Sequence, residues 1–391
     1  MDKHFLIFRL LTSKEIANQP HCCSCVNFVS LWLSNSLNMS TQAVIVCRDF
    51  LSELQKSIGN HTAESIFILT DENTYTLCLP LLKQNNTLAN SPVFSIRAGD
   101  SHKNIEALAS VWQFLSDNGA TRKSLVITLG GGMVTDLGGF AASTFKRGVR
   151  YINIPTTLLG AVDAAVGGKT GINFNGLKNE VGVINPADTV LIETSFFASL
   201  DHQNLVSGYA EILKHALIDS DSEWEKVSAF NLQQFDLDNL RPIVESSIAI
   251  KEKIVALDPY EKNIRKALNF GHTVGHAFES ISYEKEQAVL HGYAVAWGMI
   301  CELYLSHKLL GFPKAILLQA VRIIKESYGS FVISCNDYER LYELMTHDKK
   351  NDNKEINFTL LGGIGDIRTN QNTSQKEIFE ALDFYCDSVG L

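Results

Sequence analysis

The sequence of 391 residues lacks the features that mark several special classes of protein. No stretch approaches the roughly 18 to 20 consecutive apolar residues of a membrane-spanning helix, which excludes an integral helical membrane protein. Basic residues are not in excess either, since 34 Lys and Arg stand against 43 Asp and Glu, for a formal charge of -9. This sign disfavours binding to nucleic acid or to a membrane surface through overall charge. An anionic ligand would need a local group of basic residues.

The eight cysteines lack the paired spacing of a disulfide framework. Cys22, Cys23 and Cys25 form a cluster and the others are scattered, so we expect reduced thiols and a cytoplasmic location. A zinc knuckle at the cluster is an open alternative, although no second ligand pair follows at zinc-finger spacing.

The N-terminal region is poor in charge but is not a convincing signal peptide. Residues 16–47 contain no Asp, Glu, Lys or Arg, yet polar residues interrupt the apolar ones and no cleavage site follows a continuous apolar core. We expect residues 1–38 to be a leader that is disordered or not part of the folded domain.

The rest of the chain changes character near residue 200, without a Pro-rich or Ser-rich linker and without internal repeats. Short apolar runs alternate with amphipathic segments in the first part, which predicts a parallel α/β domain over 39–199. Long segments with a period of 3.6 residues follow, which predicts a helical domain over 200–391. The expected strands are 43–46, 65–69, 93–96 and 125–129, and the expected helices are 205–218, 243–255, 273–282, 293–310 and 313–327.

A glycine-rich turn follows the apolar run at 125–129. Gly130, Gly131 and Gly132 allow backbone amides to approach an anion closely, and a helix start containing Asp136 would add its dipole. The run is not the G-x-G-x-x-G fingerprint, and such a run is often only a tight turn. Thr156 and Thr157 are equally suited to capping a helix or to binding a ligand.

Basic residues follow further glycines. Lys169 comes directly after Gly168, and Lys178 and Asn179 come after Gly176, with Arg147 upstream. Surface lysines are usually just solvated, but this concentration in an acidic chain favours an anion site.

Histidines and a glutamate suggest a metal centre. His272 and His276 are four residues apart and share one helix face, while His291 and Glu211 come from separate segments. Lys214 lies one turn after Glu211, in an apolar stretch where a carboxylate needs a charged partner. A mixed His and carboxylate set suits zinc or a similar ion at a catalytic site. The spacing leaves open which three residues bind metal, and hydrogen-bonded histidines without metal are the alternative.

Taken together, these motifs resemble those of the 3-dehydroquinate synthase family. The resemblance runs in the family's order from about residue 43 to the C-terminal region. It is carried by GGGMVTDLGGF at 130–140, Arg147-Gly148, PTTLL at 155–159, Asp163, GGKT at 167–170, LKN at 177–179, GYAEILK at 208–214, LNFGHTVGHAFE at 268–279 and LHG at 290–292.

The resemblance implies a Rossmann-like NAD-binding domain, an all-α metal-binding domain and an active site between them, in a homodimer. The implied metal is zinc, alternatively cobalt. The implied reaction converts 3-deoxy-D-arabino-heptulosonate 7-phosphate to 3-dehydroquinate and phosphate in the shikimate pathway. It proceeds by transient oxidation by NAD, phosphate elimination, reduction, ring opening and aldol closure.

Site residues are carried over from the family position by position. The metal ligands are Glu211, His272 and His291, which leaves His276 on the substrate side. The NAD-contacting positions are Asp71, Asp100, Lys103, Gly131, Gly132, Asp136, Thr156, Thr157, Lys178 and Ser199. The catalytic positions are Asp163, Lys169, Lys214, Lys251 and His276, and the other substrate-binding positions are Arg147, Asn179, Arg265, Asn269, Lys349 and Lys350.

Within this assignment, some residues have narrower roles. Lys251 and Arg265 would hold the substrate carboxylate, and Asp163 with His276 would handle protons. The phosphate would lie against Lys169, Asn179, Asn269, His276 and the Lys349-Lys350 pair. Arg147 would reach the site of the neighbouring subunit.

The chain departs from the family pattern at three positions. Asp100 replaces a more frequent Glu and Ser199 a usual Thr, both of which keep a polar group. Tyr293 stands where Glu is common, beside a metal ligand, and this bears on the surroundings of that ligand.

Three other functions compete with this interpretation. Metal-dependent polyol dehydrogenases share the nucleotide motif and a helical metal domain, but an uncharged polyol has no use for the lysines and arginine. A cyclase that makes an inosose or valiolone-type ring is the nearer alternative. A non-catalytic binding module would not need metal ligands, a cofactor site and an anion site together.

Overall fold

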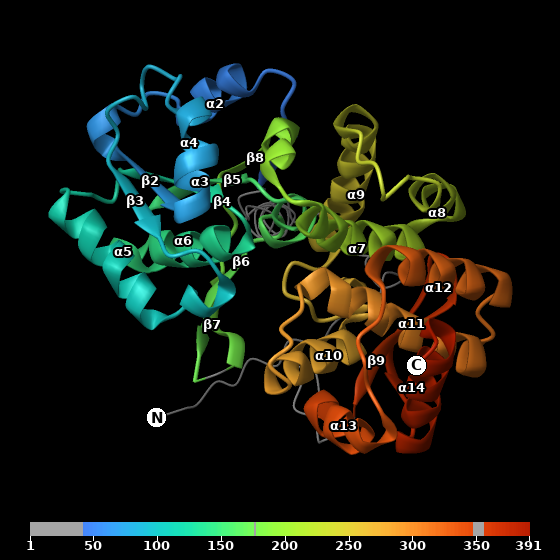
Figure 1. The fold of residues 1–391 in the computed structure, drawn as a ribbon. Coiled ribbons are helices and arrows are strands. Elements are labelled where there is room, and N and C mark those ends of the chain that lie inside the picture. Colours follow the sequence, from blue (N-terminus) through green and yellow to red (C-terminus); the bar gives the residue numbers. More distant parts are fainter. Residues whose placement is uncertain (1–41, 176, 347–355) are drawn as a thin grey trace, which may run out of the picture. The chain divides into compact units, whose positions relative to one another are not determined.

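The computed structural model describes residues 42–175, 177–346 and 356–391 (Figure 1). The expected leader at 1–38, its cysteine cluster and the Lys349-Lys350 pair lie outside the described residues. The described residues all belong to one compact unit. Within it, no helix is both long enough and apolar enough to cross a membrane.

A parallel six-stranded sheet forms the first half of this unit (Figure 1). All its paired strands run in the same direction, as expected for βα units whose helices return the chain to the same edge. In order across the sheet, the strands are β1 (Ala43–Val46), β8 (Thr189–Ile192), β5 (Arg150–Pro155), β4 (Leu125–Gly130), β2 (Ile66–Asp71) and β3 (Val93–Ile96).

Helices cover both faces of this sheet. Alternate residues of one strand pack into two different helix-covered cores. Phe67 and Leu69 of β2 belong to the core that includes helices α5 and α6, whereas Ile66 and Ile68 belong to the core that includes α2 and α4. Successive side chains of a strand point to opposite faces, so both faces are apolar and buried. The helices of this half are α2 (Phe50–Ile58), α3 (Glu72–Leu77), α4 (Leu79–Leu82), α5 (Ile105–Asp117) and α6 (Gly132–Thr144).

An antiparallel hairpin, β6 (Lys169–Phe174) and β7 (Leu177–Ile184), leaves the sheet region before β8. Strand β6 packs against α6, but β7 is exposed along its whole described length. It carries Val181, Val183 and Ile184, whose side chains are about two-fifths exposed at 41%, 38% and 41%. Sequence patterns did not predict this exposed apolar strand, nor the strands β6 and β8.

The second half is rich in helices, as predicted, and begins with α7 (His202–Asp219), whose N-cap Asp201 accepts a hydrogen bond from the Asn204 amide at 2.7 Å. It also contains an antiparallel hairpin, β9 (Asn357–Gly363) and β10 (Asp366–Asn372), so it is not all-α. The other helices are α8 (Asp221–Ser228), α9 (Leu237–Leu257), α10 (His272–Glu284), α11 (His291–Leu310), α12 (Lys314–Tyr328), α13 (Tyr338–Thr346) and α14 (Gln375–Val389).

Helices α10 and α11 pack with their backbones in contact. A Cβ placed on Gly298 of α11 would lie 2.6 Å from the Gly275 amide nitrogen of α10, and one on Gly275 would lie 3.0 Å from the Ala294 carbonyl oxygen. Only glycine leaves room for this approach. The two helices are therefore held at a separation that main-chain atoms set.

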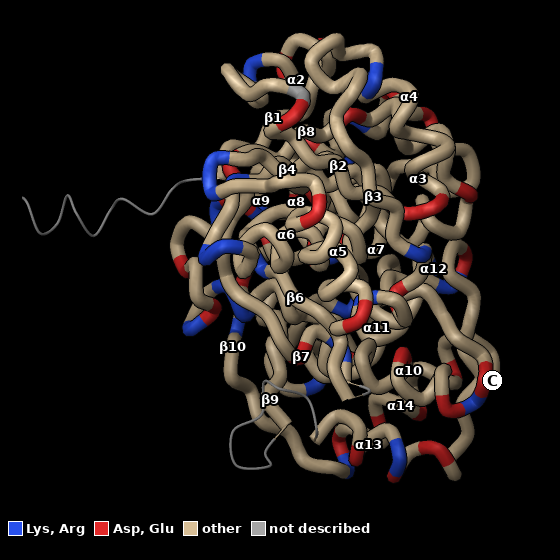
Figure 2. The backbone as a smooth tube through the Cα atoms, turned by 90° about the vertical axis from the view of Figure 1, so that its left-hand side faces the viewer, with Lys and Arg blue, Asp and Glu red and all other residues tan. Residues whose placement is uncertain are grey.

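The core continues from the α5 and α6 face of the sheet into the helical half without a break. Lys, Arg, Asp and Glu are interspersed over the described chain, and neither sign is confined to one side (Figure 2). The surface charge therefore does not indicate where an anionic ligand would bind. The buried Lys and Arg side chains are the better candidates for binding it.

Candidate active site

Several of the predicted cofactor residues lie at one edge of the sheet. Strands β2, β4 and β5 are neighbours, and Asp71, Gly130 and Pro155 are their last residues. Because the strands are parallel, Asp71, the glycine turn and Thr156 lie at the same carboxyl edge. Ligands of open α/β sheets bind at this edge.

The glycine turn leads directly into α6. Gly131 is the N-cap, no side chain caps the helix, and its first turn contains no acidic residue. A Cβ on Gly131 would lie 3.0 Å from the Thr157 methyl group, and one on Gly132 would lie 3.0 Å from the Ala164 Cβ. The glycines therefore bring the first amides of α6 close to Thr157, in an arrangement that fits a phosphate group.

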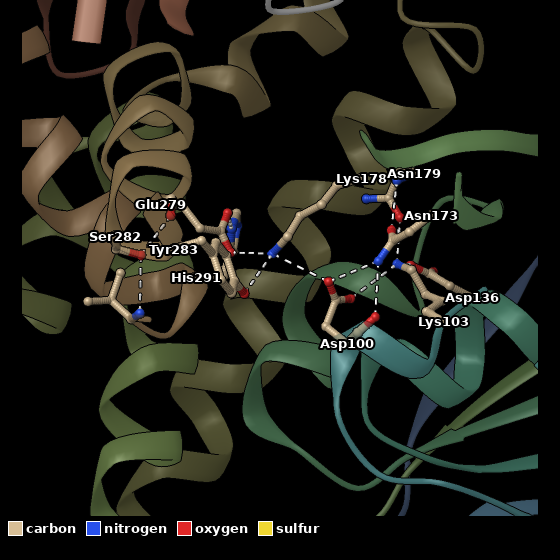
Figure 3. Close-up of polar contacts among 11 residues, drawn as sticks. Asp100, Lys103, Asp136, Asn173, Lys178, Asn179, Glu279, Ser282, Tyr283 and His291 are labelled. Atoms are coloured by element: carbon tan, nitrogen blue, oxygen red, sulfur yellow. Dashed lines mark hydrogen bonds and ion pairs between the residues drawn. The ribbon is translucent and has the colours of Figure 1, made fainter. Parts of the chain in front are cut away.

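A polar cluster adjoins this turn. The Lys103 ammonium group donates to Asp136 at 3.0 Å and to the side-chain oxygen of Asn179. Burial raises the pKa of Asp136, and Lys103 opposes that shift. Asp100 accepts from Asn173 at 3.1 Å and lies 3.4 Å from Lys178. Figure 3 shows these residues grouped on one side of Lys178.

Three other predicted cofactor residues have local structural partners. Asp71 caps α3 by accepting from the Thr74 amide at 2.7 Å, and Ser199 donates to the Phe196 carbonyl at 2.8 Å. Thr156, which is buried, donates its amide to the Gly130 carbonyl at 3.0 Å. These bonds fix their positions at the sheet edge and neither require nor exclude a ligand.

Three of the four metal-ligand candidates converge. The Oε1 atom of Glu211, on α7, lies 3.4 Å from Nε2 of His272 and 3.5 Å from Nε2 of His291. His272 is the first residue of α10 and His291 the first of α11, so three helices each supply one residue. One donor atom from each lies within 4.8 Å of the others.

The histidines are oriented as metal ligands usually are. Nδ1 of His272 bonds with the Phe270 carbonyl at 3.1 Å, and Nδ1 of His291 with Oε2 of Glu279 at 3.3 Å. Because both partners are acceptors, each Nδ1 donates to its partner, and Nε2 is the ring atom that faces Glu211 in both histidines. In metal sites, a hydrogen bond from the ring nitrogen that does not bind the metal orients the histidine in this way.

Glu211 supports the same interpretation. It is fully buried, its Oε2 accepts from Lys214, and its Oε1 has no hydrogen-bond partner among the described residues. Burial favours the protonated carboxyl, but Lys214 and His272 outweigh it and hold the pKa of Glu211 well below its usual range. A buried anionic oxygen facing two imidazoles fits a divalent cation.

His276 lies beside this group rather than in it. Its ring is 5.3 Å from that of His272, centroid to centroid. His276, Glu279 and His291 form a second group of possible ligands, and Asp163, Glu211 and His215 form a third. Only the first group combines an unpartnered carboxylate oxygen with two ring nitrogens fixed toward it.

The predicted carboxylate-binding residues are buried cations. Lys251 donates to both the side chain and the backbone carbonyl of Asp163. The Arg265 guanidinium is only 2% exposed, donates to the Pro259 carbonyl at 2.6 Å and to the Gly167 carbonyl at 3.0 Å, and leaves Nε without a partner within the described chain. A buried guanidinium bound only by neutral acceptors fits an anionic ligand.

The predicted phosphate-binding residues Lys169 and Asn269 meet at an acidic residue. Glu261 accepts from the Lys169 ammonium group and from the Asn269 amide, the latter at 2.8 Å. Glu261 therefore accepts the hydrogen bonds that Lys169 and Asn269 would otherwise donate to a phosphate. Arg147 is exposed, with a left-handed backbone at φ 65°, and Asn179 has φ 51°.

Tyr293, which departs from the family pattern, packs against other aromatic residues. Its ring lies 5.2 Å from that of Tyr328 and 6.0 Å from that of Trp297, centroid to centroid. It is thus part of an aromatic cluster.

Sequence reasoning missed Glu261, Glu279 and His215 as site residues. Glu279 lies seven residues after His272 and three after His276, so helical spacing was a signal that could have placed it on their face. Glu261 and His215 carried no comparable signal, because their partners come from distant segments.

The fold belongs to a class that pairs a nucleotide-binding sheet with a helical metal-binding half. A valiolone synthase from Streptomyces hygroscopicus, solved with NAD+ and Zn2+ bound, superposes with a TM-score of 0.78 at 25% identity, covering 88% of this chain and 97% of that one. A 2-deoxy-scyllo-inosose synthase superposes with a TM-score of 0.73 at 21% identity, covering 87% and 95%.

The sequence comparisons identify the family. The model of the 3-dehydroquinate synthase N-terminal domain matches residues 93–207, and that of the C-terminal domain matches 208–351. The 3-dehydroquinate synthase of Parabacteroides distasonis is 52% identical over 353 residues, which are 90% of this chain and 100% of that protein. The chain belongs to the 3-dehydroquinate synthase family.

Proposed function

We propose that the protein converts 3-deoxy-D-arabino-heptulosonate 7-phosphate to 3-dehydroquinate and phosphate, the shikimate-pathway reaction of its family. The observation that carries the proposal is the convergence of Glu211, His272 and His291 in the same compact unit as the buried cations Lys251 and Arg265. The substrate needs both, since it carries vicinal hydroxyls, a carboxylate and a phosphate.

We assign the metal to Glu211, His272 and His291. Three protein ligands leave a coordination position open for substrate, as catalytic zinc sites do. A zinc or cobalt ion there would acidify a substrate hydroxyl. Lys214 would keep the Glu211 carboxylate ionised and oriented by binding its other oxygen.

We assign NAD to the carboxyl edge of the sheet. The first amides of α6 would receive its pyrophosphate, while Asp71 and Asp136 offer acceptors to its hydroxyl and amide groups. NAD would take a hydride and return it within one turnover. The cluster of Asp100, Lys103 and Lys178 borders the same edge, which supports the assignment.

Substrate binding would rest on cations that are already in place. Arg265 and Lys251 would receive the carboxylate, and Lys169 with Asn269 would receive the phosphate once Glu261 releases them. Asp163 is the candidate proton carrier. Although burial raises its pKa, Lys251 outweighs that effect and holds the pKa below its usual range, so the carboxylate is ionised.

We further propose a cytoplasmic homodimer. The five cysteines that the structure describes are free thiols, which suits a reducing compartment. Strand β7 exposes an apolar edge, which soluble proteins normally cover, and a second copy of the chain is the occupant we propose. Exposed Arg147 would then enter the partner's site. Light scattering should give a dimer mass, and Val181→Lys should shift it toward the monomer.

The decisive test is a paired assay on purified protein with the heptulosonate phosphate, NAD and zinc. Phosphate release and NADH absorbance are followed together, with and without chelator. Chelator-sensitive phosphate release without accumulation of NADH supports the proposal. Release from a different sugar phosphate would instead assign a related cyclase activity, and NADH accumulation with a simple polyol would assign a dehydrogenase.

A further inference from the structure

Glu279 contacts both sides of the candidate site with one carboxylate. Its Oε1 accepts from the Lys178 ammonium group at 2.6 Å, and its Oε2 lies 3.3 Å from Nδ1 of His291 (Figure 3). The side chain is buried on α10, while Lys178 comes from β7 and His291 from the start of α11. The three residues therefore join β7 to two consecutive helices, of which α10 places Glu279 101 residues after Lys178.

The contacts of Lys178 extend this connection to the sheet. Its ammonium group lies 3.4 Å from Asp100 and 5.1 Å from the centre of the Tyr283 ring. Figure 3 shows Lys178 stretched between Asp100 on one side and Glu279 on the other. The order of contacts is Asp100, Lys178, Glu279, His291, and Nε2 of His291 faces Glu211.

We infer that Glu279 is a positioning residue that couples Lys178, on the cofactor side, to the metal ligand His291. This inference rests on the proposed function, because it takes His291 as a ligand and the sheet edge as the NAD site. Glu279 acts through its neighbours. It fixes the His291 ring with the proton on Nδ1, and Lys178 holds the second oxygen so that the carboxylate keeps its orientation.

A carboxylate is needed because both contacts require an acceptor. Glutamine has nearly the same shape but offers one acceptor oxygen and one donor nitrogen. In Glu279→Gln, the amide can satisfy either His291 or Lys178, and its NH2 group then faces the other donor. The substitution therefore tests the shared carboxylate with little change in volume.

The coupling makes a specific prediction for Lys178. Lys178→Met removes a residue that does not touch the proposed ligands, yet it leaves Glu279 without the contact that orients it. Zinc affinity should fall in both variants, and the Lys178 effect should vanish once Glu279 is replaced, because it passes through Glu279. If Glu279 and Lys178 acted independently, their losses of zinc affinity would add in the double variant, or Lys178→Met alone would cause no loss.

The experiment measures zinc affinity by chelator competition, without substrate or NAD, in the wild type, Glu279→Gln, Lys178→Met and the double variant. Lys285→Met is the matched control, since Lys285 follows α10 directly but pairs with Asp337. We expect a loss of about tenfold or more for Glu279→Gln, a loss of about fivefold for Lys178→Met, no further loss in the double variant and no change in the control.

A second readout separates this inference from the proposed function and from a folding defect. NMR of metal-free protein should show the His291 Nδ1–H hydrogen-bonded and slow to exchange with solvent in the wild type, and faster to exchange in Glu279→Gln. Unchanged affinity and Nδ1–H exchange in Glu279→Gln would overturn the inference while leaving the metal site intact. If His272→Ala leaves zinc affinity unchanged, the metal assignment fails, and this inference with it.

Discussion

The Glu302 carboxylate of α11 accepts hydrogen bonds from the backbone amides of Gly271, at 2.6 Å, and of Val274, at 3.2 Å. Both amides belong to the start of α10, where no side chain of α10 provides a cap. Glu302 is fully buried, so one helix uses an acidic side chain to complete the N-terminus of another. That N-terminus carries His272.

Replacing Glu302 with alanine should therefore affect both stability and metal binding. Two buried amides would lose their acceptor, which we expect to lower the free energy of unfolding by about 1 to 3 kcal/mol. Glu302→Gln keeps one acceptor oxygen and should lose less. Urea unfolding of chelator-treated protein measures stability, and chelator competition measures zinc affinity. Wild-type values for Glu302→Ala in both would contradict the capping role.

His272→Ala should abolish zinc binding and turnover together. It removes one of the three proposed ligands and leaves the buried Glu211 oxygen facing a single imidazole. His61→Ala is the control, because His61 lies on the surface near Arg150. Metal analysis of the purified variants, followed by the phosphate-release assay, checks the expectation. Full turnover by a metal-analysed His272→Ala protein would remove His272 from the ligand set.

Lys251→Met should raise KM for the heptulosonate substrate and lower kcat. The variant loses the buried cation that we propose for the substrate carboxylate and releases Asp163 from the contact that orients it. Lys253→Met on the same helix is the matched control, since its side chain is 71% exposed. Steady-state kinetics with varied substrate separate the two constants. Equal kinetics for the two variants would show that Lys251 does not contact the substrate.

His215 should make stability depend on pH. Burial, reinforced by Lys214, lowers its pKa to about 3 from an ordinary 6.5. Below pH 6.5 the unfolded chain binds a proton that the folded protein does not, so stability falls as the pH decreases toward 3. One such group contributes about 1.4 kcal/mol per pH unit within this window.

His215→Gln removes the titrating ring and can still bond with Ser247, the partner of His215 Nδ1. Unfolding free energies from roughly pH 6 to pH 4 should fall less steeply in the variant than in the wild type, by about 1.4 kcal/mol per pH unit. Parallel curves for the two proteins would show that His215 protonates in the folded state.

Much of the architecture could be predicted because it depends on local sequence. The strands predicted at 43–46 and 93–96 have these bounds in the structure, since short apolar runs rich in β-branched and aromatic residues favour strands. The spacing of His272 and His276 indicated a shared helix face in the same way. Lys214 was expected to meet Glu211, and it does, because residues three apart on a helix are neighbours.

The features that escaped prediction depend on contacts between distant segments. Glu261 lies 92 residues from Lys169, and Glu302 lies 31 residues from Gly271. The sequence alone therefore could not distinguish either glutamate from one that is simply exposed to solvent. The β9 and β10 hairpin was not predicted, because β10 consists almost entirely of polar residues and lacks the apolar pattern of a strand. Tertiary packing, rather than propensity, decides such elements.

The glycine contact between α10 and α11 has a consequence for the choice of ion. His272 and His291 are the first residues of these two helices, and main-chain atoms at Gly275 and Gly298 set the separation of the helices. Side chains can yield to a larger or smaller ion, but touching backbones cannot. Under the proposed metal assignment, main-chain contact would therefore limit the separation of the two imidazoles, and an ion would have to match that separation to bind both.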